Sequence, residues 1–454
     1  MSELQRIQIF GLYGNRNVDA VIENNTLIIV GENGSGKTTF LRIVFYLLSG
    51  RWVSLLQFRF QSLLISINGA EYAVTYEQIK KAYSNIDRRM LPSVPPSIIQ
   101  RFSEIMEKGD SARAYGELER LSERYGIPSH LILRHIEAAD ENPRGPKRLL
   151  QDIGRKIRDS INAQILYLPT YRRIERELGS IFEGMDQVDF QKQRLVKRQN
   201  ESADAYIELV EFGMKDVQEA INRTLGQLKD FARESLNNLT LKYLGDVVNR
   251  EYEKVDMFDV ADAPEDTVRA VLDRIHDNIL AKTDKQHLFS VINSARGVSV
   301  PSEHEKIIYH YFLKLLRFQE ALQDREMQIS QFCELCSEYI VDKTFAYDSS
   351  NFSFSINSAD AWNTEHEVEL SDLSSGEKQI VSLFSHLYLS GQSRFFVLID
   401  EPELSLSVPW QRRFLADIRM GKFCAGLIAV THSPFIYENE LKPYAHSLGE
   451  FVWY

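Results

Sequence analysis

The chain has 454 residues, of which 44% are hydrophobic and 26% charged, and its formal net charge is −11. This length predicts a globular protein of about two to three domains, and the negative charge argues against a surface devoted as a whole to nucleic acid. Three cysteines are too few for a disulfide framework. No leader pattern or membrane-spanning apolar run is expected, so a cytoplasmic location is predicted.

The first elements predicted are two alternating segments around a glycine-containing turn, within RIQIFGLYGNRNVDAVIEN at residues 6–24. Such alternation is typical of a small antiparallel sheet. Tyr13 lies in the turn, where it could stack on an adenine ring or be an ordinary half-buried strand aromatic. The pattern leaves both interpretations open.

A phosphate-binding loop follows the apolar run 27–30, which predicts a buried parallel strand. Gly31, four residues and then Gly36-Lys37-Thr38 match G-x-x-x-x-G-K-[ST] before a predicted helix. Glycines let backbone N–H groups turn towards phosphate oxygens, and the helix directs its positive end at the same anion. Lys37 adds a charge beside the β- and γ-phosphates, and the Thr38 hydroxyl is a ligand for Mg²⁺. The predicted ATP contacts here are Asn33, Gly34, Ser35, Gly36, Lys37, Thr38 and Thr39.

The segment from residue 51 to residue 160 is expected to hold a β-hairpin and then a helical lid or interaction lobe. Two alternating stretches flank Asn68-Gly69, a strong hairpin signal, and should complete the antiparallel sheet. Residues 165–168 predict one more strand, which Pro169 ends.

A mostly helical insertion is predicted between residues 181 and 345. After Pro301, apolar residues recur on alternating three- and four-residue steps, as in a coiled coil, and Arg325 interrupts them. The members of this seam are Ile308, Tyr311, Leu315, Phe318, Leu322, Ile329, Phe332, Cys336 and Tyr339. An earlier helix, about 203–240, is expected to pair with it through Val217, Ile221, Leu225, Leu228, Phe231 and Ala232. A protruding arm and a compact bundle both remain open.

Other features of the two insertions favour packing over chemistry. Cys333 and Cys336 form C-x-x-C inside the predicted helix, without two further evident zinc ligands. Basic residues cluster in two places, where a solvated helix face is favoured over contact with nucleic acid. The two clusters are Arg144, Lys147 and Arg148, and Lys192, Arg194, Lys197 and Arg198.

Two later strands end in polar side chains. The apolar run 395–399 leads into Asp400 and Glu401, and 427–430 leads into Thr431-His432. Carboxyl ends of parallel strands are where α/β sheets bind ligands. We therefore expect Asp400 to hold Mg²⁺ through water, Glu401 to polarise the attacking water, and His432 to contact the γ-phosphate.

Taken together, these motifs resemble those of the ABC ATPase superfamily. GENGSGKT resembles its Walker A motif, LSSGEKQ its signature, VLIDEPE its Walker B motif and THSP its histidine switch, and residues 404–407 stand at the D-loop position. The resemblance implies an α/β head, with a P-loop mixed sheet, an antiparallel β subdomain and large helical insertions. It divides the chain into residues 1–50, 51–160, 161–180, 181–345 and 346–454.

The signature implies an assembly of copies, because in this superfamily the signature of one head reaches the ATP bound to another. The residues implied are Ser374, Ser375, Gly376 and Glu377, at the start of a helix. A homo-oligomer with ATP between its heads is therefore expected. Transporter-type heads use a loop glutamine on Mg²⁺ near position 170, but Thr170 stands here, followed by Arg172 and Arg173. These arginines could contact phosphate or a neighbouring subunit, or pair with nearby glutamates.

The exact residues of these motifs indicate which branch of the superfamily the chain resembles. Ser375 and Glu377 replace the commoner residues of LSGGQ, and this variant is more usual among chromosome-maintenance and defence ATPases than among transporters. With YLPTYRRIE, it most resembles the overcoming-lysogenization and RecF-like branch, and there the PtuA ATPases of the Septu anti-phage system. That resemblance implies a separate HNH nuclease subunit, PtuB. The ATPase of the PARIS defence system, with another effector, and a DNA-binding RecF-like or Rad50-like repair ATPase are the alternatives.

Overall fold

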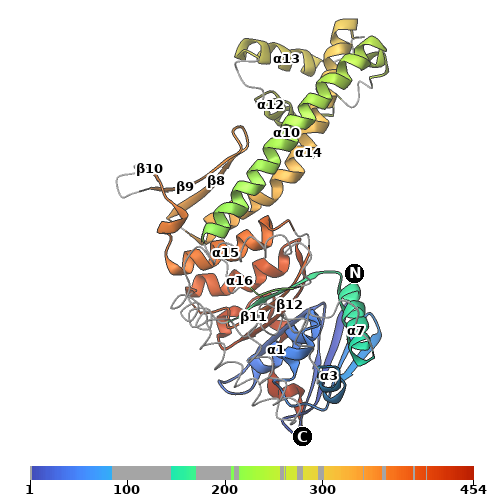
Figure 1. The fold of residues 1–454 in the computed structure, drawn as a ribbon. Helices are drawn as coiled ribbons and strands as arrows, with labels where there is room; N and C mark the ends of the chain where they lie inside the picture. Colours follow the sequence, from blue (N-terminus) through green and yellow to red (C-terminus); the bar gives the residue numbers. More distant parts are fainter. Residues whose placement is uncertain are drawn as a thin grey trace, which may run out of the picture. The chain divides into compact units, whose positions relative to one another are not determined.

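The computed structural model divides the chain into two compact units, Met1–Phe212 with Gln392–Tyr454, and Gly213–Gly391. Figure 1 shows the course of the chain. The structure describes residues 3–83, 145–169, 206–208, 214–255, 260, 262–273, 280–294, 301–340, 342–359, 365–391, 394–404 and 406–454. The finer five-part division stays a prediction.

A six-stranded sheet of parallel pairs forms the centre of the first unit, in the order β13-β3-β12-β11-β6-β7. Its strands are β3 (Thr26–Val30), β6 (Gln164–Leu168), β7 (Tyr206–Glu208), β11 (Phe395–Asp400), β12 (Cys424–Thr431) and β13 (Ala445–Ser447). The four predicted apolar strands are confirmed. The helix predicted from residue 203 is wrong at its start, because residues 206–208 pair with β6.

The second sheet of this unit is antiparallel, in the order β14-β2-β1-β4-β5. Its strands are β1 (Leu4–Leu12), β2 (Arg16–Val21), β4 (Ser62–Ile67), β5 (Ala70–Thr75) and β14 (Val452–Trp453). Asn68 and Gly69 have φ angles of 52° and 76°, the left-handed values that a two-residue hairpin turn requires. The predicted hairpin and its place beside the N-terminal strands are both confirmed.

Helices join the two sheets into one hydrophobic core. They are α1 (Lys37–Ser49), α2 (Trp52–Leu55), α3 (Tyr76–Tyr83) and α7 (Pro146–Ile161), while α16 (Val408–Met420) packs against β12. Leu150, Ile157 and Ile161 make one buried face of α7, and this face packs on α1 and α3. The described part of the predicted lid therefore belongs to the core of the head, and residues 84–144 lie outside the described ranges.

The second unit is built on a helical hairpin of α10 (Met214–Val248) and α14 (Glu303–Tyr339), which lie side by side. Ser302 and Glu305 form a capping box that fixes the start of α14. The other elements of this unit are α12 (Glu265–Asp273), α13 (Lys282–Ser294), β8 (Lys343–Asp348), β9 (Ser353–Ala359), β10 (Glu365–Glu367) and α15 (Ser375–Leu389). At the end of α14, the Tyr339 ring lies 5.4 Å from the Phe384 ring of α15.

Contacts along the hairpin confirm that the two predicted helices pair, and they show that the pairing is antiparallel. The Arg325 guanidinium lies 4.0 Å from the centre of the Phe231 ring, and the Tyr243 and Tyr311 rings lie 4.7 Å apart. Arg325 interrupts the apolar repeat without leaving the seam, because its planar cation stacks on an aromatic face. Near the far end, Asp246 pairs with Lys314 and His310, whose hydrogen bonds lower the pKa of its carboxyl.

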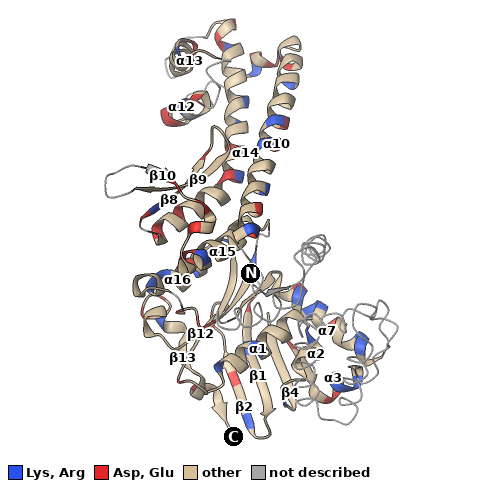
Figure 2. Cartoon of the chain, turned by 60° about the vertical axis from the view of Figure 1, so that its left-hand side comes forward, with Lys and Arg blue, Asp and Glu red and all other residues tan. Residues whose placement is uncertain are grey.

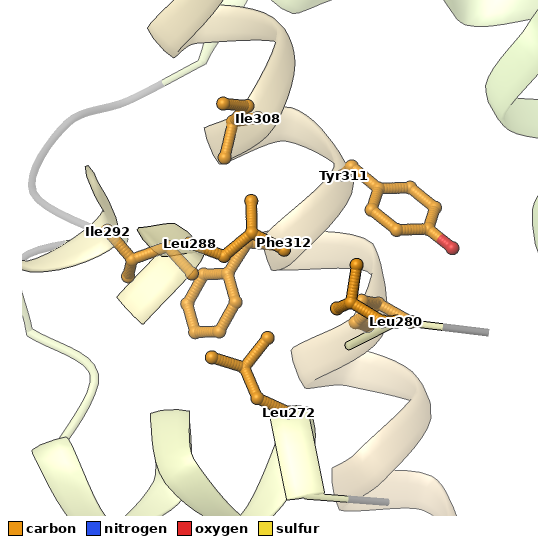
Figure 3. Close-up of a pocket in the computed structure, with 8 residues that line it drawn as sticks. Leu272, Leu280, Leu288, Ile292, Ile308, Tyr311 and Phe312 are labelled. Carbon is orange, nitrogen blue, oxygen red and sulfur yellow. The ribbon is translucent and has the colours of Figure 1, made fainter. Parts of the chain in front are cut away.

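A small helical cluster covers another face of α14. Tyr309, Phe312 and Leu315 share a core with Val268 of α12 and Ile292 of α13. An apolar pocket opens within this cluster (Figure 3), lined by Leu272, Leu280, Leu288, Ile292, Ile308, Tyr311, Phe312 and Leu315. The described insertion therefore combines the two arrangements that the sequence left open, a long hairpin and a local bundle.

The two cysteines of the C-x-x-C pair are packing residues. Cys333 and Cys336 are buried on α14, and burial raises the pKa of the Cys333 thiol to about 12 and that of Cys336 well above its ordinary value. Both are therefore protonated packing residues at neutral pH.

Lysines and arginines gather on α7 (Figure 2), where the Lys147 ammonium lies 5.4 Å from the centre of the Tyr83 ring. Arg144 and the 192–198 cluster lie outside the described residues. Among the helices that the structure describes, none is long and apolar enough to cross a membrane.

Candidate nucleotide-binding site

The loop between β3 and α1 has the backbone that a phosphate cradle needs. Gly31, Gly34 and Gly36 have φ angles of 152°, 80° and 98°, which side-chain-bearing residues rarely adopt. Gly36 is the N-cap residue of α1, so the loop leads directly into the positive end of that helix. The other predicted contacts of this loop, Asn33, Ser35 and Thr39, are exposed or half-buried.

Lys37 folds back over this loop. Its side chain is buried, and its ammonium donates hydrogen bonds of 2.8 Å to the Gly31 carbonyl and 2.9 Å to the Glu32 carbonyl. Burial lowers the pKa of Lys37, although the carboxylates of Glu401, Asp400 and Glu403 oppose that shift. The cation therefore lies where these carbonyls hold it and the neighbouring carboxylates attract it.

The two residues predicted to hold a metal lie side by side. The Thr38 hydroxyl donates a hydrogen bond of 3.1 Å to Oδ1 of Asp400, which is buried at the carboxyl end of β11. A hydroxyl and a carboxylate are hard oxygen donors, the kind that Mg²⁺ prefers. The donor set therefore fits the expected ion.

The two predicted catalytic side chains also meet. Nε2 of His432 lies 3.9 Å from Oε1 of Glu401, and its Nδ1 lies 3.5 Å from the Lys37 ammonium. Glu401 has a φ angle of 52°, an uncommon value for a residue with a side chain, and such strain gathers at functional sites. His432 thus stands between the phosphate loop and the end of β11.

Arg16 is a neighbour of the site that sequence reasoning missed. Its guanidinium Nη2 donates a hydrogen bond of 2.8 Å to the Ser35 carbonyl, and a Cβ atom placed on Gly36 would lie only 3.0 Å from its Nη1. The arginine therefore lies against the phosphate loop. No sequence motif marked it, because β2 reaches the loop only in the folded sheet.

Glu403 was also missed. Its carboxylate accepts hydrogen bonds of 2.8 Å from the Thr431 hydroxyl and 2.7 Å from the His432 backbone N–H. Only its position in the sequence, two residues after Glu401, could have indicated that Glu403 lies near the site. Glu403 therefore links the turn after β11 to the turn after β12.

The predicted signature residues lie in the second unit, at the start of α15. Ser374 is the N-cap residue, Ser375 is exposed, and Gly376 is half-buried. The Glu377 carboxylate is buried, where it accepts hydrogen bonds of 2.7 Å from the Ser374 N–H and 2.9 Å from the Lys343 ammonium. Glu377 thus fixes the start of the helix, while Ser374 and Ser375 are exposed to solvent and Gly376 is half-buried.

Some predicted features remain expectations. Thr170, Arg172, Arg173 and Ser405 lie outside the described residues. Tyr13 is 59% exposed, so the alternative of a half-buried strand aromatic is wrong, and stacking on adenine stays a prediction.

Replacing Lys343 by methionine is expected to destabilise the start of α15 by about 1–3 kcal/mol at pH 7, because a nearly buried charged hydrogen bond is lost. Burial alone would raise the pKa of Glu377, but Lys343 and Ser374 lower it below its ordinary value of 4.5. The ionised Glu377 carboxylate therefore stabilises the folded state fully above pH 4.5, and this stabilisation is lost as the pH falls through the lowered pKa. Urea unfolding at pH 7 and at lower pH should show a difference from wild type that shrinks in acid. Lys378→Met, which changes a lysine on α15 itself, is the control; an equal loss there would contradict the assignment.

Comparison with known proteins identifies the family. A model described as "AAA domain" matches residues 6–285, and one described as "AAA domain, putative AbiEii toxin, Type IV TA system" matches residues 173–438. Each covers more than half of the chain, so the chain belongs to the AAA-domain family. No curated protein matches it.

Two solved structures are similar at 14% identity. One is an Smc head domain of Pyrococcus furiosus with an extended coiled coil, bound to the C-terminal domain of ScpA (TM-score 0.35; 96% of this chain and 91% of that chain covered). The other is an Smc head domain of Pyrococcus yayanosii with a coiled coil and joint (TM-score 0.29; 96% and 93% covered). At such TM-scores nothing about function follows.

Proposed function

We propose that this chain binds and hydrolyses ATP, and that it works as a nucleotide-dependent switch. The observation that carries the proposal is the convergence of Lys37, Thr38, Asp400, Glu401 and His432 on the ends of neighbouring parallel strands. Glycine-lined N–H groups, a lysine and a hydroxyl–carboxylate pair are the parts that phosphoryl transfer requires.

The residues have distinct roles in this proposal. Backbone N–H groups of residues 33–39 and the Lys37 ammonium bind the phosphates, with Thr38 and Asp400 holding Mg²⁺. The bound ion would neutralise the charge that develops on the phosphate oxygens. Glu401 orients a water and accepts its proton as the water oxygen bonds to the γ-phosphorus and the bond to the β–γ bridging oxygen breaks, leaving ADP and phosphate. His432 contacts the γ-phosphate and steadies the same water.

Two copies would complete each site. The exposed start of α15 offers the Ser374 hydroxyl, backbone N–H groups and the positive end of a 15-residue helix. These groups suit the γ-phosphate of an ATP bound to another copy. ATP would then hold the copies together, and hydrolysis would release them.

The effector is proposed to be a separate HNH-type nuclease of the PtuB kind, in a cytoplasmic defence system. The resemblance of LSSGEKQ and YLPTYRRIE to PtuA supports this assignment. A PARIS-type effector or direct DNA binding by a repair ATPase is the second candidate. Expression of the chain with its neighbouring reading frames decides between them, because a co-purifying HNH protein favours the first. ATP-dependent DNA binding by the chain alone would favour a repair ATPase.

The clamp itself is tested by light scattering after size exclusion. The mass of the purified chain is expected to rise at least twofold on addition of ATP and Mg²⁺, whereas Lys37→Ala should keep the mass of the ATP-free protein. Lys80→Ala, on α3, is the matched control and should behave as wild type. An unchanged wild-type mass, with ATP binding intact, would count against the clamp.

A further inference from the structure

Gln411, on α16, connects two turns that flank the candidate site. Its Nε2 amide donates hydrogen bonds of 3.0 Å to the Leu406 carbonyl and 3.3 Å to the Glu403 carbonyl. Its Oε1 accepts a hydrogen bond of 2.7 Å from the Ser433 hydroxyl. One side chain therefore uses both ends of its amide to join the turn after β11 to the turn after β12.

The Glu403 side chain also links the turn after β11 to the turn after β12. Its carboxylate holds the Thr431 hydroxyl and the His432 N–H, and the Ser433 N–H donates a 3.0 Å hydrogen bond to the same Thr431 hydroxyl. The result is a closed ring of hydrogen bonds through Glu403, Thr431, Ser433 and Gln411. The backbone N–H of His432, the residue between Thr431 and Ser433, donates to Glu403 and so joins this ring.

The ring matters because His432 lies on a turn, beyond the last residue of β12. Its imidazole still lies 3.5 Å from the Lys37 ammonium and 3.9 Å from the Glu401 carboxylate. A displacement of about 1 Å at a reacting centre can slow a reaction on the order of 100-fold. Bonds that fix both turns therefore bear directly on the placement of the imidazole.

We propose that Gln411 and Glu403 are positioning residues, which hold the His432 imidazole at its place beside the Glu401 carboxylate. This inference rests on the proposed function, in which those two side chains act in ATP hydrolysis. The side-chain hydrogen bonds of Gln411 run to the Ser433 hydroxyl and to the carbonyls of Glu403 and Leu406, so it is expected to act through those groups. Its loss is therefore expected to slow turnover and to leave ATP binding unchanged.

The test compares Gln411→Ala, Ser433→Ala and the double variant in steady-state and single-turnover ATP hydrolysis. Each single variant is expected to lower kcat about 10-fold with KM within about twofold, because the loss falls on the transition state. The double variant is expected to be no slower than the slower single variant, since both changes break the same ring. Arg413→Ala, on the same helix and paired with Asp417, is the control and should keep wild-type kcat.

Gln411→Glu separates the two halves of the connection. It keeps an acceptor for Ser433 but has no amide donor for the carbonyls of Glu403 and Leu406, so it should be as slow as Gln411→Ala. Wild-type kcat in Gln411→Glu would overturn the role of the hydrogen bonds to the Glu403 and Leu406 carbonyls. Wild-type kcat in Gln411→Ala, a shared rise in KM, or additive losses in the double variant would overturn the whole inference. Failure of the proposed function looks different, because wild type itself would then show no hydrolysis in single turnover.

Discussion

Replacing Glu401 by glutamine is expected to slow ATP hydrolysis by at least about 100-fold and to trap the chain as an ATP-bound oligomer. Glutamine keeps the shape of the side chain but removes the charge that polarises water, and a positioned base contributes on the order of 100-fold or more. Binding should persist, because the proposed phosphate ligands are the loop after β3 and Lys37, which the substitution leaves unchanged. Glu401 also keeps a backbone hydrogen bond of 2.9 Å to the Val430 carbonyl, which the substitution leaves in place.

The measurement pairs single-turnover hydrolysis with light scattering in ATP and Mg²⁺. Glu401→Gln should retain unhydrolysed ATP and a mass above that of the ATP-free protein for longer than wild type. Glu440→Gln, at an exposed position of the same unit, should match wild type in both assays. Rapid hydrolysis by Glu401→Gln would remove this residue from the catalytic role.

Replacing Ser374 by arginine is expected to leave ATP binding intact and to abolish ATP-dependent association. Ser374 is exposed at the start of α15 in the second unit, whereas Lys37 and the rest of the proposed phosphate loop lie in the first. An arginine removes the N-cap hydroxyl, at about 1 kcal/mol, and places a bulky side chain where the γ-phosphate of another copy should lie. ATP titration should therefore look like wild type while light scattering shows only the ATP-free mass.

Mixing variants sharpens the test. Ser374→Arg keeps an intact phosphate loop, and Lys37→Ala keeps an intact signature. A mixture of the two is expected to regain one complete site for each pair of copies, and so part of the association that neither shows alone. Ser371→Arg, three residues before the signature serine and also exposed, is the control. Loss of ATP binding by Ser374→Arg alone would mean that the signature acts within its own chain.

Elements with a local cause could be predicted from the sequence. The phosphate loop depends on glycines that adopt positive φ, and the hairpin at Asn68-Gly69 depends on two residues suited to left-handed angles. The strand ends at Asp400 and Thr431 follow from short apolar runs. Each such signal lies within a few consecutive residues, so tertiary context was not needed to find it.

Features that depend on distant contacts could not be predicted. Residues 206–208 form a strand because β6 offers an edge, and a helix was expected there. Arg16 reaches Ser35 across the sheet, and Gln411 reaches Ser433 from another element. The Glu377 carboxylate was assigned to the nucleotide site, yet Lys343 and Ser374 engage it, a partnership that spacing along the chain does not reveal.

The attachment of α15 to the end of α14 has a mechanical consequence. The Tyr339 and Phe384 rings join the two helices, and the Lys343–Glu377 pair joins α15 to the strand that follows α14. The hairpin and the start of α15 thus belong to one compact body. A torque applied to the distant end of the hairpin would be carried along α14 to Ser374, without passing through the parallel sheet. Under the proposed clamp, a load on the hairpin would therefore act directly on the residues expected to contact the ATP of another copy.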